Sequence, residues 1–248
     1  MESLPKFILA LAACFGLPAI CLVLKPYADE RNRQPILYTS AETHPDLGEE
    51  VDTVFYDKPE LKGVVFPAAT AGSKKRGQLV YQQMGCAQCH TQIIRPSFIG
   101  VDPFKKGWGG EQTPLGMPET RPSTAWDYLG EDFAMIGQRR LGPDLANAGY
   151  RIKSASDLHL MLYAPRAVKP WSNHPNFSSL YDSVAIESTP RADALPIPAK
   201  LSIPAGQQIV PNSDAKALAE YILGLKRDLP LPISISGKTV AEKKAAAK

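Results

Sequence analysis

The clearest pattern along the chain is an uncharged apolar run from Phe7 to Leu24, with a lysine at each end. As a helix this run would be about 27 Å long, close to the thickness of the hydrocarbon core of a bilayer. It predicts a transmembrane anchor over residues 1–25, mildly kinked at Pro18. A cleaved secretory signal and a lipoprotein cleavage box at 11–14 are the alternatives. Cleavage at that box would leave an apolar segment exposed, which favours the uncleaved anchor.

Residues 26–72 carry scattered prolines, acidic residues and threonines. Their apolar pieces, at 51–55 and 64–66, are short and suit strands or extended contacts. This composition predicts an extended stalk that lies on a partner. A flexible tether is the alternative.

Helical periodicity begins at Ser73, which can cap a helix that leads directly to Cys86. One side of this helix carries Gly77, Val80, Tyr81 and Met84. A second helix is predicted to start at Asn212–Asp214 and to continue through Lys226. Its recurring apolar positions are Ala215, Leu218, Ala219, Ile222 and Leu225. With a further helix predicted over 156–163, the fold class is mainly α.

The composition limits both the size of the fold and its partners. With 248 residues, 44% hydrophobic content and 23 prolines, the chain suits one medium domain plus extended segments. We expect this domain over residues 73–227, followed by a flexible tail over 228–248. The net charge of +3, without a basic stretch interleaved with aromatic residues, predicts no nucleic-acid partner.

The chemistry-bearing motif is a complete C-x-x-C-H, formed by Cys86, Cys89 and His90. This pattern attaches one c-type haem: two thiols form thioethers with the vinyl groups, and the imidazole is the proximal iron ligand. A redox C-x-x-C has no use for the following histidine and belongs near a βαβ pattern. A zinc site needs further ligands, and the remaining cysteines, Cys14 and Cys21, lie inside the apolar run. The motif therefore predicts one covalently bound haem c.

Three stretches together resemble a known family. They are CHTQIIRP at 89–96, LGPDL at 141–145 and LYAPRAV at 162–168. Over roughly residues 5–228 the chain resembles the monohaem membrane-anchored subunit of cbb3-type cytochrome c oxidases. The resemblance implies a class I cytochrome c fold with a long insertion at 97–140, preceded by the transmembrane helix and the stalk.

The resemblance also implies specific contacts. In class I cytochromes c the first and last helices cross through a glycine and aromatic residues, which Gly77, Tyr81 and Tyr221 resemble. The carbonyl of Pro143 is implied to accept the ring N–H of His90, which fixes the orientation of this ligand.

Arginines are the predicted partners of the haem propionates, since a guanidinium matches a carboxylate with two hydrogen bonds. Arg95 and Arg166 lie in the matched stretches and are preferred to Arg139 and Arg140. The insertion is too long for an idle loop. It is expected either to cover the haem edge or dock a partner, or to hold tryptophans that pack locally.

One departure concerns the distal iron ligand. Where the family has a methionine, residues 170–175 read PWSNHP, so that His174 occupies the methionine position. The resemblance and ligand chemistry together predict ligation of the iron by His90 and His174, with a lower potential than for a His/Met pair. Met117, and after it Met135, remain the alternatives.

The resemblance implies a non-catalytic electron-transfer subunit. It would take electrons from another c-type cytochrome and pass them to the haem–copper catalytic subunit of a terminal oxidase. The implied location is the bacterial inner membrane, crossed once, with the haem domain in the periplasm, although the charges flanking the anchor favour the opposite orientation. An anchored cytochrome shuttle, a subunit of another respiratory complex and a haem-based gas sensor are the alternatives.

Overall fold

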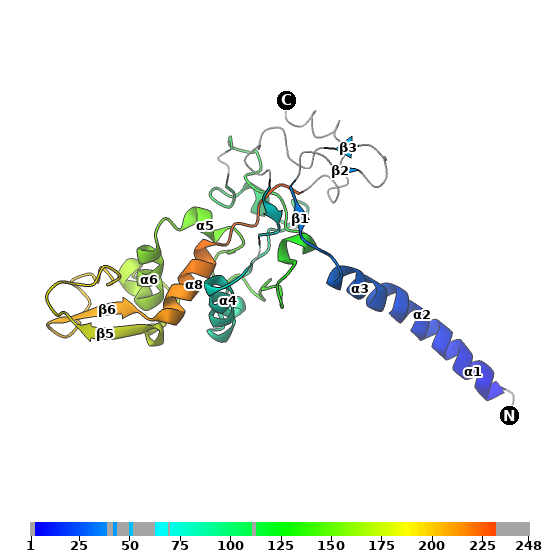
Figure 1. The fold of residues 1–248 in the computed structure, drawn as a ribbon, viewed down its shortest axis with the longest axis horizontal. Coiled ribbons are helices and arrows are strands. Elements are labelled where there is room, and N and C mark those ends of the chain that lie inside the picture. The colour runs from blue at the N-terminus through cyan, green and yellow to red at the C-terminus, as the bar shows by residue number, and fades with distance from the viewer. Residues whose placement is uncertain are drawn as a thin grey trace. The chain divides into compact units, whose positions relative to one another are not determined.

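The structure is a computed structural model that describes residues 3–38, 42–43, 50–51, 63–68, 70–110 and 113–231 (Figure 1). It divides into two units, Met1–Ile36 and Leu37–Lys248, each considered by itself.

The first unit is an apolar helix, as its sequence predicts. It comprises α1 (Ser3–Leu11), the π-helical turn η1 (Ala12–Gly16), α2 (Leu17–Ala19), a second π-helical turn η2 (Ile20–Leu24), and α3 (Lys25–Arg31). Within the helical span Ser3–Asp29, an 18-residue window has a mean hydropathy of 2.7 and none of it is buried, so the span is long and apolar enough to cross a membrane. A signal sequence has the same features.

The helix differs from the prediction at its C-terminal end and around Pro18. It continues past the predicted anchor to Arg31, where an ion pair between Lys25 and Asp29 at 2.8 Å joins successive turns. The two π-helical turns lie on either side of Pro18. Proline has no amide hydrogen to donate, and a π-helical turn changes the pairing of the backbone hydrogen bonds near it.

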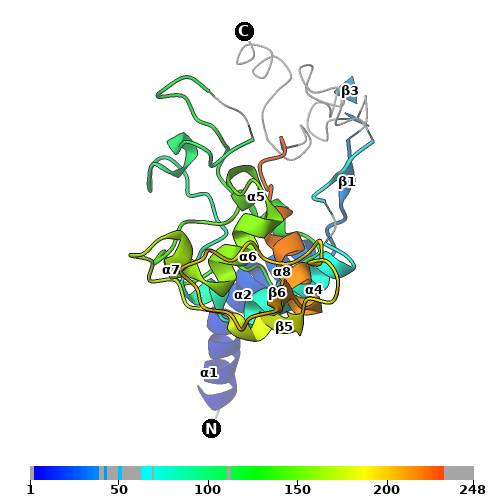
Figure 2. The same ribbon diagram turned by 90° about the vertical axis from the view of Figure 1, so that its left-hand side faces the viewer.

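The second unit is mainly helical, with short strands. Its helices and turns are α4 (Ser73–Gln83), η4 (Cys86–Gln88), η5 (Asp102–Phe104), η6 (Ala125–Tyr128), α5 (Ala148–Arg151), α6 (Ala155–Tyr163), α7 (Pro165–Val168), η7 (Ser178–Leu180) and α8 (Ser213–Leu223). The strands β5 (Tyr181–Ala185) and β6 (Gln207–Pro211) form an antiparallel hairpin. The helix α8 packs against α4, α6 and the strand β6, and Figure 1 and Figure 2 show α6 and α8 beside this hairpin. Their buried side chains form the main core, which includes Val80, Tyr81, Leu158, Leu162, Leu180, Ile209, Leu218 and Ile222.

The crossing of α4 and α8 is the closest helix contact in this core. A Cβ atom at Gly77 would lie 2.0 Å from the carbonyl oxygen of Ala217 and 2.7 Å from Cβ of Tyr221. The rings of Tyr81 and Tyr221 meet edge to face, with centroids 5.6 Å apart. The predicted contact between these helices is therefore present, and only a glycine fits at its centre.

Substitution of Gly77 by alanine is expected to destabilise the domain by about 3 kcal/mol, because the added methyl group would force the two helices apart. The higher helix propensity of alanine offsets about 1 kcal/mol of the clash. Chemical denaturation of the chain in detergent micelles, followed by circular dichroism, measures the change. Gln82→Ala, at an exposed position of the same helix, is the matched control; a loss as large as that of the Gly77 variant would contradict the packing explanation.

The predicted helix ends are partly correct. The prediction that Ser73 caps α4 is wrong: Gly72 is the N-cap, it offers no side chain, and Ser73 is the first helical residue. The predicted start of α8 is confirmed: Asn212 is its N-cap, and its side chain accepts hydrogen bonds at 3.0 Å from the amides of Asp214 and Ala215. This helix ends at Leu223, before the predicted Lys226, and the buried Leu225 packs from the segment beyond it.

Part of the predicted stalk and tail packs together. The short strands β1 (Ile36–Leu37) and β4 (Val65–Phe66) pair, and β2 (Glu42–Thr43) pairs with β3 (Glu50–Val51). The buried rings of Tyr38 and Phe66 pack with Leu229 and Leu231, and the Tyr38 hydroxyl donates to the carbonyl of Pro230. The tail predicted to be flexible from residue 228 is therefore bound at its start. The rest of the stalk (39–41, 44–49, 52–62 and 69) and of the tail (232–248) lies outside the described residues.

Candidate metal centre at the C-x-x-C-H segment

The motif residues come from one tight turn at the end of α4. Gly85 adopts a left-handed conformation, with φ of 72°, and redirects the chain into the short helix η4. The amides of Cys89 and His90 then donate to the carbonyl of Cys86 at 3.1 and 3.0 Å. Both thiols and the imidazole are half-buried. The turn thus presents two sulfurs and one ring nitrogen from a single short segment.

The two thiols are free, and the surroundings of Cys86 differ from those of a redox-active thiol. Burial raises the pKa of Cys86 to about 11, whereas reactive thiols in C-x-x-C sites have lowered pKa values. The half-buried Cys86 thiol is therefore poorly suited to disulfide exchange.

The ring of His90 is fixed on one side by the Gly142–Pro143 turn. Its Nδ1 lies 2.8 Å from the carbonyl oxygen of Pro143 and must donate there, because a carbonyl only accepts. The turn is anchored by the Gly142 amide, which donates to the carbonyl of Cys89 at 2.9 Å. A Cβ atom at Gly142 would lie 2.2 Å from Cε1 of His90. The predicted contact with Pro143 is present, and the absence of a side chain at Gly142 makes room for the ring.

His174 approaches His90 from the segment after α7. The two ring centroids are 6.1 Å apart, with an angle of 49° between the ring planes. The His174 Nδ1 lies 2.8 Å from the carbonyl oxygen of Pro175, and its amide donates to the Ser172 hydroxyl at 3.2 Å. Burial and the proximity of His90 lower the pKa of His174, against the raising effect of the bond to Pro175. The imidazole is therefore kept in its neutral, metal-binding form.

The two histidines can share one metal ion. Each ring donates through Nδ1 to a proline carbonyl, and neither Nε2 atom has a hydrogen-bond partner among the residues that the structure describes. Two imidazoles that bind one ion at about 2 Å from opposite sides have ring centres about 6 Å apart. The observed separation of 6.1 Å is compatible with this arrangement. Haem iron, which takes two axial ligands, fits this donor set and the adjacent thiols.

The alternative methionine ligands lie in different surroundings. Met117 is on an exposed turn, with 57% of its surface accessible, and Met135 is 8% exposed within the main core. The structure therefore brings His174, rather than Met135, to the candidate centre, and leaves the thioether of Met117 exposed.

The arginines assigned to propionates have other partners in the structure. Arg95 forms a two-pronged contact with the buried Asp102, at 3.0 and 3.2 Å. The exposed Arg166 makes a long contact from Nε to the carbonyl of Ser172, at 3.5 Å. That contact links α7 to the segment bearing His174. A propionate role for either arginine stays a prediction.

Asp102 and Arg140 of the predicted insertion form, with Asp144, a buried charge cluster that sequence reasoning did not find. Asp102 and Asp144 are fully buried, and the Arg140 guanidinium lies 2.7 Å from Asp102 and 3.3 Å from Asp144. Trp108 packs locally against Ile94 and Ala146, as one of the two expectations had it. The sequence could have pointed to Asp144, because this carboxylate directly follows the Gly-Pro pair. No sequence pattern pointed to Asp102.

The charge cluster predicts how stability depends on pH. Burial alone would raise the pKa of Asp102, but hydrogen bonds from Arg95 and Arg140 lower it to about 2. The unfolded value is about 3.9, so the stability contribution is fully present above about pH 4 and is lost as the pH falls towards 2.

We therefore expect Asp102→Asn to destabilise the domain at pH 7 and to flatten the decline of stability between about pH 4 and 2. Denaturation curves across this range measure both effects. The exposed Asp182→Asn is the control; an unchanged acid limb in the Asp102 variant would contradict the assignment.

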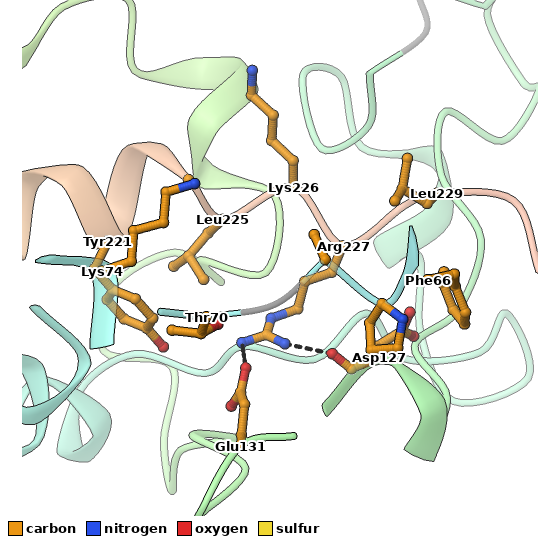
Figure 3. A pocket seen from close by; sticks show the side chains of 13 residues that line it. Phe66, Thr70, Lys74, Asp127, Glu131, Tyr221, Leu225, Lys226, Arg227 and Leu229 are labelled. Carbon is orange, nitrogen blue, oxygen red and sulfur yellow. Dashed lines mark hydrogen bonds and ion pairs between the residues drawn. The ribbon is translucent and has the colours of Figure 1, made fainter. Parts of the chain in front are cut away.

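A separate hollow near the end of α8 contains none of the predicted site residues (Figure 3). Arg227 fills its floor, bonding the carbonyl of Asp127 at 2.6 Å and the carboxylate of Glu131. Arg227 also reaches Gln92, at 3.3 Å, which receives a second bond from Tyr221. These contacts tie the segment after His90 to the last helix.

The comparisons with known proteins do not assign a family. No protein-family model matches this chain, and no curated protein matches it in a sequence search. Within the described part of the chain, no group of three or more His, Cys, Asp or Glu side chains is placed to hold a metal ion.

Proposed function

We propose that this chain is a membrane-anchored c-type cytochrome with one haem, which passes electrons to the haem–copper catalytic subunit of a terminal oxidase in aerobic respiration. The observation that carries the proposal is the approach of His174 to His90, at 6.1 Å between ring centres, next to two thiols with thioether spacing. In this proposal Cys86 and Cys89 would hold the haem covalently, and His90 and His174 would bind its iron.

Haem iron held there accepts and releases one electron at a time. The part played by the chain is to orient the ligands. The hydrogen bond from His90 Nδ1 to Pro143 keeps Nε2 free of a proton and makes the imidazole a stronger donor. The bond from His174 to Pro175 does the same on the other side. Two imidazoles stabilise oxidised iron better than an imidazole and a thioether do, which favours a low-potential electron donor.

The apolar helix supports the membrane part of the proposal. A helix from Ser3 to Asp29 is long enough to hold the second unit at the bacterial inner membrane. We propose that this unit faces the periplasm and receives electrons from another c-type cytochrome. Tethering on one membrane raises the effective concentration of the domain near an oxidase.

Spectroscopy of the purified full chain tests the cofactor and its ligands. We expect covalently bound haem, with the low-temperature electron paramagnetic resonance and near-infrared magnetic circular dichroism of a low-spin His/His centre. A His/Met signature would return the distal position to a methionine. A five-coordinate high-spin signature with rapid carbon monoxide binding would favour the gas-sensor alternative. A chain that matures without covalent haem would contradict the proposal.

Purification from native membranes in a mild detergent tests the partner. We expect the chain to copurify with a haem–copper subunit in a fixed ratio. A variant without residues 3–31 should keep its haem spectrum. A chain that separates from the oxidase and exchanges electrons with several complexes would favour the shuttle alternative.

A further inference from the structure

The buried charge cluster of Arg140, Asp144 and Asp102 flanks the proximal histidine. Both carboxylates are 0% exposed, and the Arg140 side chain, which bridges them, is 18% exposed. Arg95 contributes a second guanidinium to Asp102. Lys105 lies 3.7 Å from the same carboxylate. Two buried negative charges are therefore paired with three positive charges within one network.

Hydrogen bonds connect this cluster to both ends of the contact between His90 and Pro143. Thr91, which follows His90, donates to Asp144 at 2.6 Å and accepts from Arg140 Nε at 2.6 Å. Asp144, which follows Pro143, also accepts from the amide of Ile93 at 2.8 Å. The carboxylate of Asp144, next to the acceptor, thus binds the segment that follows the donor. A shift of Arg140 or Asp144 would move the two partners relative to each other.

We propose that Arg140 and Asp144 are positioning residues for the proximal imidazole, and that their buried charges set the reduction potential of the haem. This inference rests on the proposed function. Reduction adds a negative charge to the haem, so a nearby buried carboxylate opposes it and a nearby guanidinium favours it. Removal of Arg140 or of Asp144 changes the net charge of this cluster by one unit in a low-dielectric interior, where solvent screens it little.

Redox titration of the full chain in detergent tests this proposal with two variants of opposite charge effect. Arg140→Gln removes one buried positive charge and is expected to disfavour reduction about tenfold, a shift of about −59 mV for one electron. Asp144→Asn removes one buried negative charge and is expected to shift the equilibrium about tenfold the other way. A purely structural role would loosen the contact between His90 and Pro143 in both variants and move both potentials in the same direction.

Three further variants separate charge from fold. Arg139→Gln makes the same charge change at an exposed neighbour, and we expect less than about a twofold effect because solvent screens it. Arg140→Lys keeps the charge and should restore most of the equilibrium constant. Arg95→Gln removes the half-exposed partner of Asp102 and should disfavour reduction in the direction of Arg140→Gln, by a smaller factor. Its expected effect stands even where Arg140→Gln fails to fold.

The outcomes are distinct for the two proposals. Opposite shifts for the Arg140 and Asp144 variants, or the graded shift of Arg95→Gln where these do not fold, support the inference. Shifts of the same sign, or an effect of Arg139→Gln as large as that of Arg140→Gln, overturn the inference and leave the proposed function standing. An unmutated chain without thioether-bound haem overturns both.

Discussion

Replacing Cys86 and Cys89 together by alanine is expected to abolish covalent haem attachment, because both thioether bonds of the proposed centre come from these two sulfurs. A haem stain after denaturing electrophoresis measures the loss, since only covalently held haem stays with the chain. Each single variant should keep one thioether, which the pyridine haemochrome spectrum distinguishes from two. The expected result for the double variant is complete loss of the stain.

The chain supplies its own control for this experiment. Cys14 and Cys21 are exposed on the apolar helix and lie outside the motif, so Cys14→Ala with Cys21→Ala should leave the stain unchanged. Doubly linked haem in a Cys86→Ala chain would contradict the assignment. So would loss of the stain in the control variant.

The helices were predictable where local sequence determines them. The cap at Asn212 and the apolar spacing after it act within a few residues, and α8 begins where this pattern predicts. The errors fell at helix ends. Ser73 is as good a cap as any in the sequence, yet the structure uses Gly72, which differs by one residue.

In the candidate centre, too, the residues of one local motif could be predicted from the sequence alone, whereas distant contacts could not. Cys86, Cys89 and His90 form one continuous motif, so the prediction of haem attachment needs no knowledge of the fold. Pro143 lies 53 residues from His90, and its contact was inferred from family resemblance rather than from spacing. The role of His174 depended on the same resemblance.

The pairing of the charged residues could not be predicted from the sequence. Arg95 and Arg140 were reasonable partners for a propionate, because a guanidinium has no preference between one carboxylate and another. In the structure both contact Asp102, from a stretch without helical or strand periodicity. Such a pairing forms only when the fold closes, so periodicity and motif spacing carry no signal for it.

Replacing His174 by alanine is expected to open the sixth position of the proposed haem. The centre should then change from a low-spin His/His signal to a high-spin signal in electron paramagnetic resonance. Carbon monoxide should bind rapidly to the reduced protein, because no imidazole must first leave. His174→Met should instead stay low-spin and raise the reduction potential by on the order of 100 mV, within the roughly 0.8 V range that axial ligands span.

The matched control for this prediction is Met117→Leu, since Met117 is the main alternative ligand. Its side chain is 57% exposed, so replacing it should change neither the spectrum nor the potential. A high-spin signal in the Met117 variant, together with an unchanged spectrum in His174→Ala, would move the distal ligand to the methionine. The contact between the rings of His90 and His174 would then be a packing contact of the haem-free chain. If His174 is the distal ligand, only its replacement changes the spectrum; if Met117 is the ligand, only the replacement of Met117 does. The two variants together therefore assign the distal position.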